Sequence, residues 1–423
     1  MKIVKRDGTI VDYDREKIRV AIQKANAEVR GREKISKEGI EVNTGSGSLL
    51  ITKVKPENKG LMSAYDFANG AVNILNRLNT VDYLCFGAEN NDLKLFDIIT
   101  EIIVNEPSAY SSLLKSKLKT GMSYPAARQA AIISYLKEQS KSEKSSYENC
   151  DEGIITDILS LPNNILAIEY LAALKRTNST IKPLIIKRET SKYNDEKMSG
   201  KISSALSIRK ALYSKTDSED NDINSIFNKT KNSLPDFSLT ILKETYKKEY
   251  PLMNNALLPF IQDKIFAAKE KYSNICDLTP ALLNKLFKSD LRMDYNELIE
   301  SLKSKDITEA RINRALVHLI LEYTSTDREL FYENGTAYYA SILSFKKTCT
   351  ELIKNIKDAG SIPLITKKSD FEKCLKNYPD INEALAKRMW ELDIMASKLY
   401  GNLVYNNLGT VIPNDFTANL PIV

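Results

Sequence analysis

Hydrophobic positions in the middle of the chain form two short runs that each end in a turn-forming or charged residue. Residues 83–86 lead to Gly87, and residues 183–186 lead to Lys187-Arg188. Apolar runs of this length, bounded in this way, are typical of buried strands. Amphipathic spacing predicts a helix over residues 93–104, after the first strand. We therefore expect a parallel α/β unit whose ligands sit beyond the carboxyl ends of its strands.

The N-terminal segment has a different pattern. Asp7-Gly8 separates two apolar runs, which favours a hairpin, and Asp14 can cap a helix over residues 15–29. Residues 43–48 have the composition of a flexible connector, and residues 49–54 fit one strand. The glycines of the connector lack the preceding strand and following helix of a phosphate-binding loop, so we interpret them as linker.

These changes of pattern divide the chain into four segments. They are a hairpin and helix over residues 1–40, a linker over 41–60, an α/β domain over 61–234 and a helical domain over 235–423. The last segment has amphipathic periodicity through most of its length and no strong strand pattern, which predicts helices.

Composition narrows the classes of function. The 423 residues suffice for two or three domains, and the net charge of +6 permits polyanion binding without demanding it. The five cysteines have no paired spacing, which favours reduced thiols over a disulfide framework or a zinc site. No apolar run has the length of a signal-peptide core or a membrane span. We expect a soluble cytoplasmic protein without a metal site or membrane contact.

The chain contains one histidine, His318, inside the apolar segment 314–321. This segment predicts a packed helix, so we expect His318 to be a core or supporting residue rather than a catalytic one. Mechanisms that need a pair of histidines are excluded.

Several polar residues stand where predicted strands end or predicted helices begin. These candidate nucleotide contacts are Gly87, Asn163, Asn164, Arg188, Ser203, Ser204 and Arg209. A serine pair at a helix N-terminus can bind phosphate oxygens together with free backbone N–H groups, although such a pair is more often only a cap. Arg188 can neutralise a phosphate, Gly87 permits close backbone approach, and either asparagine offers a donor and an acceptor.

The first residues resemble the start of an ATP-cone, the regulatory nucleotide-binding module of ribonucleotide reductases and their repressors. The resemblance rests on Lys5-Arg6-Asp7-Gly8, Tyr13, Lys17-Ile18, Ala21-Ile22 and Ala25. It implies phosphate contacts by Lys5, Arg6 and Lys17. A solvated basic hairpin and helix is the alternative interpretation of so short a segment.

Most of the remaining chain resembles the bacterial tRNA(Met) cytidine acetate ligases, which are nucleotidyltransferase-like proteins with a helical C-terminal half. The matching blocks are residues 86–89, 121–128, 161–166, 186–188, 202–209 and 303–318. The resemblance extends from about residue 61 to near the C-terminus. It implies an α/β fold: an incomplete nucleotidyltransferase-like (Rossmann-like) parallel sheet followed by an all-helical C-terminal domain, after a short N-terminal hairpin and helix.

The resemblance also implies an activity. Such enzymes use ATP to activate acetate as acetyl-adenylate and then acetylate the wobble cytidine of elongator tRNA(Met). ATP is thus the expected substrate, with Mg²⁺ as its candidate companion, while no residue is assigned to catalysis. The implied ATP contacts are Gly87, Asn163, Asn164 and Arg188, with Ser203, Ser204 and Arg209 near the phosphates. The implied contacts to the tRNA backbone are Lys303, Lys305, Arg311 and Arg314, which would make binding salt-dependent.

The chain departs from this family at its beginning. The family starts with a strand, a His-x-Gly-His motif and a helix, and those histidines stabilise the α-phosphate during transfer. Residues 1–60 contain no histidine, and losing one such donor typically costs about 10²–10³ in rate. Three hypotheses therefore stay open: an acetate–tRNA ligase homologue of reduced turnover, a non-catalytic tRNA-binding remnant, and a nucleotide-sensing module controlled by the cone-like segment.

Overall fold

The computed structural model describes most of the chain after residue 63 and the backbone of four short strands before it. The described residues are 2–4, 10–12, 40–44, 47–51, 64–122, 124–140, 151–188, 207–209, 227–228, 230–290, 292–304, 307–414 and 416. The helix predicted over residues 15–29, the Ser203-Ser204 pair and Lys305 lie outside the described residues.

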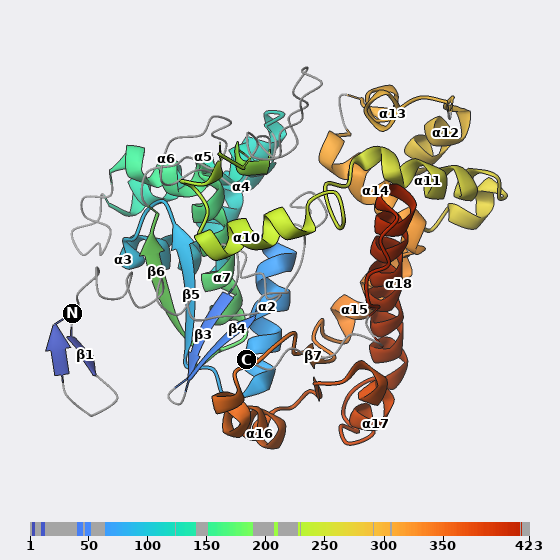
Figure 1. Cartoon of the computed structure of the whole chain (residues 1–423). Helices are drawn as coiled ribbons and strands as arrows, with labels where there is room; N and C mark the ends of the chain where they lie inside the picture. The colour runs from blue at the N-terminus through green and yellow to red at the C-terminus, as the bar shows by residue number, and fades with distance from the viewer. Residues whose placement is uncertain are drawn as a thin grey trace.

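Two parallel strands lie at the centre of the α/β half (Figure 1). β5 (Tyr83–Ala88) pairs with β6 (Lys182–Lys187), and both lie where the apolar runs predict strands. β5 continues through Gly87, which pairs with Ile186, to Ala88. Gly87 is therefore the penultimate residue of the strand, and the carboxyl ends of both strands meet at one edge.

Helix α7 connects the strands to two cores. The helices of this half are α2 (Ala64–Leu78), α3 (Leu93–Asn105), α4 (Ser108–Lys119), α5 (Tyr124–Gln139), α6 (Glu152–Ser160) and α7 (Pro162–Arg176). One face of α7, with Ile168 and Leu171, packs with α3, α5 and α6. Tyr170 and Leu174 on another face join the core of α2. Because α7 is buried on both sides, its N-terminus is held in a fixed place beside the carboxyl end of β5.

The N-terminal strands form two hairpins. β1 (Lys2–Val4) pairs antiparallel with β2 (Ile10–Asp12), as Asp7-Gly8 predicts. β3 (Ile40–Thr44) pairs antiparallel with β4 (Gly47–Ile51), where the sequence predicts a linker followed by one strand. The composition misled the prediction, because a two-residue connection containing glycine favours a hairpin as well as a flexible linker. β3 lies beside β5 (Figure 1).

The C-terminal half is helical, as predicted, apart from one short parallel pairing of β7 (Ala340–Ser341) with β8 (Leu364–Ile365). Its α-helices are α10 (Asp236–Thr245), α11 (Leu258–Ile265), α12 (Pro280–Lys288), α13 (Tyr295–Leu302), α14 (Glu309–Leu321), α15 (Ser325–Glu333), α16 (Thr350–Ala359), α17 (Phe371–Leu375) and α18 (Glu383–Leu408). Its 3₁₀ helices are η1 (Asn254–Leu257), η2 (Lys269–Tyr272), η3 (Lys347–Cys349) and η4 (Lys368–Asp370). Among the described residues, no helix has both the length and the apolar character that crossing a membrane requires.

The cores show how the two halves are joined. Leu75 of α2 and Leu84 of β5 share one buried cluster with Ile356 of α16 and Trp390 of α18. Helices α11–α14 have a separate core, and they lie beside the upper end of α18 (Figure 1). The α16–α18 region thus packs on the α/β half, whereas α11–α14 form a unit of their own at the other end of α18.

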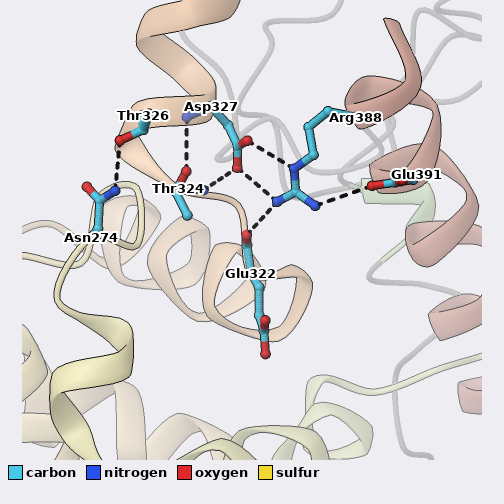
Figure 2. A network of polar contacts seen from close by, with 7 residues as sticks. All are labelled: Asn274, Glu322, Thr324, Thr326, Asp327, Arg388 and Glu391. Carbon is cyan, nitrogen blue, oxygen red and sulfur yellow. Dashed lines mark hydrogen bonds and ion pairs between the residues drawn. The ribbon is translucent and has the colours of Figure 1, made fainter. Parts of the chain in front are cut away.

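Arg388 of α18 fixes the start of α15 (Figure 2). Its guanidinium donates from Nε and one terminal nitrogen to Asp327, both at 2.9 Å, and to the carbonyl of Glu322 at 2.9 Å. Asp327 also accepts from the backbone N–H of Thr324, whose hydroxyl accepts in return from Asp327. This reciprocal capping box starts α15, so Arg388 ties α18 to the junction between α14 and α15.

Candidate nucleotide and tRNA sites

Gly87 and Arg188 meet at the carboxyl ends of the two strands. The backbone N–H of Arg188 donates to the carbonyl of Ala88 at 2.8 Å, which continues the ladder by one residue. A Cβ atom added to Gly87 would lie 3.5 Å from Cγ of Arg188. Both residues are exposed, so a ligand can reach the bare backbone of Gly87 and the Arg188 guanidinium at the same edge.

Glu89 joins this edge to the N-terminus of α7. Its carboxylate accepts from Nδ2 of Asn163 at 2.6 Å, from the backbone N–H of Asn164 at 2.9 Å and from that of Asn163 at 3.4 Å. These backbone groups belong to the first turn of α7, where N–H donors have no partner within the helix. The structure thereby brings Asn163 and Asn164 into contact with Glu89, which follows Gly87 by two positions in the chain. Glu89 belongs to the matching block 86–89, but the sequence alone assigns it no role.

Asn164 supports this arrangement from the inside. Its side chain is fully buried, with Oδ1 accepting from the backbone N–H of Asn90 at 3.0 Å and Nδ2 donating to the carbonyl of Asp157 at 3.2 Å. Both ends of the amide are therefore engaged within the protein. The geometry favours Asn164 as a residue that orients the loop after β5, in place of the direct ATP contact that the sequence suggested, and leaves Asn163 as the accessible asparagine.

An ion pair further along α7 stiffens the same region. Two terminal nitrogens of Arg128 in α5 donate to one carboxylate oxygen of Glu169, each at 3.1 Å. Glu169 is almost completely buried, and breaking a buried pair of this kind is costly. The block around Arg128 that resembles the ligases therefore includes a contact that holds α5 against α7. Nothing in the spacing along the sequence points to Glu169 as its partner.

The third predicted element, around Arg209, is only partly described. Ser203 and Ser204 lie outside the described residues, and Ser207–Arg209 form a short helical stretch. Ile208 packs in a small cluster with Phe227 and with Leu239 of α10, while Arg209 is exposed. This cluster is separate from the cores that surround β5 and β6. The phosphate roles proposed for this segment therefore stay predictions.

The predicted basic group on the helical half is divided. Lys303 pairs with Glu300 and Glu309, with nitrogen–oxygen distances of 2.5 and 3.0 Å. Arg311 and Arg314, one turn apart on α14, both face Asp277: Nε of Arg314 donates at 3.0 Å, and Nε of Arg311 lies 3.8 Å away. Carboxylates therefore offset part of the positive charge that the sequence suggested.

Asp277 also belongs to a compact cluster with the neighbouring Cys276 and His318. Nδ1 of His318 lies 3.1 Å from the carbonyl of Cys276 and 3.6 Å from Asp277, and burial lowers the pKa of the imidazole. A thiol, a carboxylate and an imidazole are metal-binding groups. However, Arg314 holds the carboxylate and the Arg328 guanidinium lies 3.7 Å from the thiol sulfur, so their charges oppose a cation here. His318 is a supporting residue of α14, consistent with the sequence prediction.

An open pocket of about 410 Å³ lies between the two halves of the chain. It is lined by Tyr65 and Asp66 of α2 and by Arg328, Glu329, Tyr332 and Glu333 of α15. The hydroxyl of Tyr332 donates to Asp66. Three carboxylates in the lining make this pocket a poor receptor for a triphosphate, because they would repel it.

Comparisons with known proteins identify the family and agree with the fold. Residues 56–412 match the family described as HIGH Nucleotidyl Transferase, and residues 1–43 match the ATP cone domain. The tRNA(Met) cytidine acetate ligase of Acetivibrio thermocellus is 34% identical over 381 residues, which cover 89% of this chain and 85% of that protein. The ligase of the same name from Clostridium kluyveri strain NBRC 12016 is 34% identical over 354 residues, covering 83% and 79%.

Solved structures share the architecture. Thermotoga maritima TmcAL bound with alpha-thio ATP superposes with a TM-score of 0.72 at 22% identity, over 86% of this chain and 81% of that one. The apo form superposes with a TM-score of 0.73 at 23% identity, over 86% and 82%. The predicted fold class, an α/β nucleotidyltransferase-like half followed by a helical half, is confirmed.

Proposed function

The chain belongs to the tRNA(Met) cytidine acetate ligase family of HIGH nucleotidyl transferases, and we propose that it binds ATP at the carboxyl ends of β5 and β6. The observation that carries this proposal is the meeting of Gly87, Arg188 and Asn163 at one edge of the parallel strands. Ligands of open α/β sheets bind beyond this edge. A bound ATP analogue in the T. maritima relative supports the same chemistry.

We further propose that this ATP activates acetate. A carboxylate oxygen of acetate would attack the α-phosphorus, and pyrophosphate would leave. The exocyclic amino group of the wobble cytidine of elongator tRNA(Met) would then attack the carbonyl carbon of the acetyl-adenylate, which releases AMP and the amino proton. The first step requires alignment of two anions and stabilisation of the charge that develops at phosphorus. Arg188 has the forked donors that bind phosphate oxygens. Ser203, Ser204 and Arg209 remain the proposed phosphate contacts of the following segment.

Turnover is expected to be slow. Residues 1–60 contain no histidine, and the loss of one preorganised donor to the transition state typically lowers the rate by about 10²–10³. The residues proposed to contact ATP at the strand ends and tRNA on α14 lie outside that segment, so binding can persist where transfer is slow.

The test is acetate-dependent exchange of labelled pyrophosphate into ATP, together with ATP calorimetry. We expect slow exchange that falls at least about tenfold in Arg188→Met, the usual loss for a hydrogen bond to a charged group. Lys187→Met, which changes the neighbouring charge at the end of β6, is the matched control. Binding of ATP without exchange would reject the ligase step, and absence of both would reject the nucleotide site.

We propose that Arg311 and Arg314 contribute to tRNA binding from α14, with Lys303 and Lys305 near the start of that helix. Arg311 suits the test, because its side chain is 40% exposed. Its Nε lies 3.8 Å from a carboxylate oxygen of Asp277, a longer contact than that of Arg314. Filter binding of elongator tRNA(Met) by Arg311→Gln should weaken, with a salt dependence shallower by about one unit. Arg292→Gln, whose side chain is 90% exposed, is the control. Equal behaviour of the two variants would contradict this surface.

A regulatory nucleotide site is the second candidate function, and the match of residues 1–43 to the ATP cone domain favours it. We propose that Lys5, Arg6 and Lys17 contact phosphates there. Calorimetry of the full chain should then resolve two ATP-binding events, one of which disappears in the Lys5→Gln, Arg6→Gln double variant. A single event that this double variant does not alter would exclude a working cone.

A further inference from the structure

The Glu89 carboxylate determines which way the Asn163 amide faces. Three N–H groups converge on Glu89, at 2.6 Å from Nδ2 of Asn163 and at 2.9 and 3.4 Å from two backbone nitrogens of α7. A carboxylate that receives three donors offers acceptors only. If the amide were turned over, its oxygen would face the Glu89 oxygen at 2.6 Å without a proton between them. The pairing therefore keeps Nδ2 of Asn163 on the Glu89 side.

The oxygen of the same amide points to the opposite side. Within the described part of the chain, Oδ1 of Asn163 has no hydrogen-bond partner, and it is not among the side-chain atoms buried from solvent. Asn163 is half-buried, whereas the neighbouring Asn164 is fully enclosed with both ends of its amide bonded. Asn163 thus presents its amide oxygen as an accessible acceptor beside the edge that carries Gly87 and Arg188.

Glu89 is itself held from two directions. Its backbone follows the last residue of β5, and its carboxylate bonds the first turn of α7, whose sides are buried in two cores. The next residue, Asn90, donates its backbone N–H to the buried amide of Asn164. Rotation of the Glu89 side chain would leave N–H donors of α7 without a partner, which is unfavourable. The orientation of Asn163 is therefore a built feature of the fold.

We propose that Glu89 is a positioning residue that fixes Asn163, so that Oδ1 of Asn163 accepts a hydrogen bond from a donor of the bound nucleotide. This inference rests on the proposed ATP site. ATP carries two kinds of neutral donor that fit: the exocyclic 6-amino group of the base and the hydroxyls of the ribose. The shared chemistry is one N–H or O–H donor facing one fixed amide oxygen, and a nucleotide that offers only an acceptor there is disfavoured.

The experiment measures calorimetric affinities of the full chain for ATP and for analogues that each lack one donor. Purine riboside triphosphate lacks the 6-amino group, while 2′-deoxy-ATP and 3′-deoxy-ATP each lack one ribose hydroxyl. In the unaltered chain one of these should bind about threefold to tenfold more weakly than ATP, the usual effect of one neutral hydrogen bond. The purine riboside arm identifies the base as the donor, and the deoxy arms identify the sugar.

The discrimination should depend on both residues. In Asn163→Ala the affinity ratio between ATP and the discriminated analogue should fall to about one. In Glu89→Gln the asparagine can turn over, so the ratio should shrink toward one while the urea unfolding midpoint stays close to that of the unaltered chain. Glu152→Gln, at an exposed acid with 57% side-chain exposure at the start of α6, is the matched control and should keep the full ratio.

The outcomes separate this inference from the proposed function. A ratio that survives in Glu89→Gln would overturn the positioning role, and a ratio that survives in Asn163→Ala would overturn the acceptor role, even with ATP bound normally. Equal affinities for ATP and all three analogues in the unaltered chain would overturn the acceptor role of Asn163. If Glu89→Gln does not fold, Asn163→Ala and the analogue series still decide. Absence of any ATP binding would reject the proposed function first, and this inference with it.

Discussion

Replacing Arg388 by methionine should destabilise the junction of α14, α15 and α18. Methionine keeps most of the aliphatic stem of arginine but removes the guanidinium that bonds Asp327 twice and the Glu322 carbonyl once. Asp327 then keeps only its capping bond to Thr324. The perturbation therefore leaves the mostly buried Asp327 carboxylate without the charged partner that Figure 2 shows beside it.

Burial sets the size of the effect. Exposed ion pairs contribute about 0–1 kcal/mol, whereas removing one partner of a buried pair costs about 3–5 kcal/mol. The Asp327 side chain is 14% exposed and close to the buried case, whereas the Arg388 side chain is 29% exposed. We therefore expect Arg388→Met to lower the free energy of unfolding by about 2–3 kcal/mol, intermediate between those limits.

A double-mutant cycle isolates the pair. Urea unfolding of Arg388→Met, Asp327→Asn and the double variant should give a coupling energy of about 2 kcal/mol, because the second substitution has little left to break. Arg292→Met is the matched control, since Arg292 makes a similar double contact with Asp290 at a site where its own side chain is 90% exposed. A loss in Arg388→Met no larger than in Arg292→Met would refute the reasoning from burial.

The pH dependence supplies a second check on the same pair. Burial opposes ionisation of Asp327, but the hydrogen bonds from Arg388 and Thr324 outweigh it and hold the pKa of the carboxyl below its ordinary value. A lowered folded-state pKa means that the stabilisation is complete above the unfolded pKa of about 3.9 and is lost as pH falls through the folded value. The coupling should stay constant from about pH 7 to 5 and decline below about pH 4.

Three further predictions concern the nucleotide edge and α14. Gly87→Ala should fold normally, because its Cβ would meet Cγ of Arg188 at an ordinary 3.5 Å, yet should weaken ATP binding in calorimetry by about tenfold or more if the nucleotide packs on that backbone. Asn164→Ala should lower the free energy of unfolding in urea by about 2 kcal/mol, since it removes the acceptor of the Asn90 N–H. Asn163→Ala should lower that free energy less than Asn164→Ala does, and should weaken ATP binding in calorimetry more. Burial lowers the pKa of His318, so the folded state favours the neutral imidazole. The free energy of unfolding should therefore be highest above about pH 6.5 and should fall as pH drops from there toward the folded-state pKa. Urea titrations of His318→Gln at several pH values should lack that fall.

The strands and the helical half could be predicted because their signals are local. The apolar runs that lead to Gly87 and to Lys187-Arg188 predict β5 and β6, and the carboxyl ends of parallel strands lie at one edge, which brings Gly87 and Arg188 together. The β3–β4 hairpin was not predicted, because its local signal is ambiguous. Its glycine- and serine-containing connection has the same composition in a linker and in a tight turn, so pattern alone does not distinguish them.

Charge pairing across the fold was beyond the reach of the sequence. Arg311 and Arg314 are three positions apart and both face Asp277, but this shared acid lies more than thirty residues earlier, in a loop. Asp277 adopts a φ of 63°, which is uncommon for a residue other than glycine and turns the chain beneath those arginines. A count of basic residues therefore overestimated the free positive charge on this surface.

Glu89 is the most consequential residue that the sequence left without a role, and it changes how the nucleotide edge divides its work. Helix N-termini commonly bind phosphate through free backbone N–H groups. At α7 the Glu89 carboxylate already accepts from the backbone N–H groups of Asn163 and Asn164, so a phosphate there would have to displace an anion of the protein itself. The positive charge of Arg188 stands next to Gly87, directly after the last residue of the neighbouring strand β6. The edge is thus polarised, with a neutral acceptor at Asn163 and a cation at Arg188. For a nucleotide bound at this edge as proposed, we therefore expect the nucleoside to lie toward α7 and the phosphates toward the end of β6.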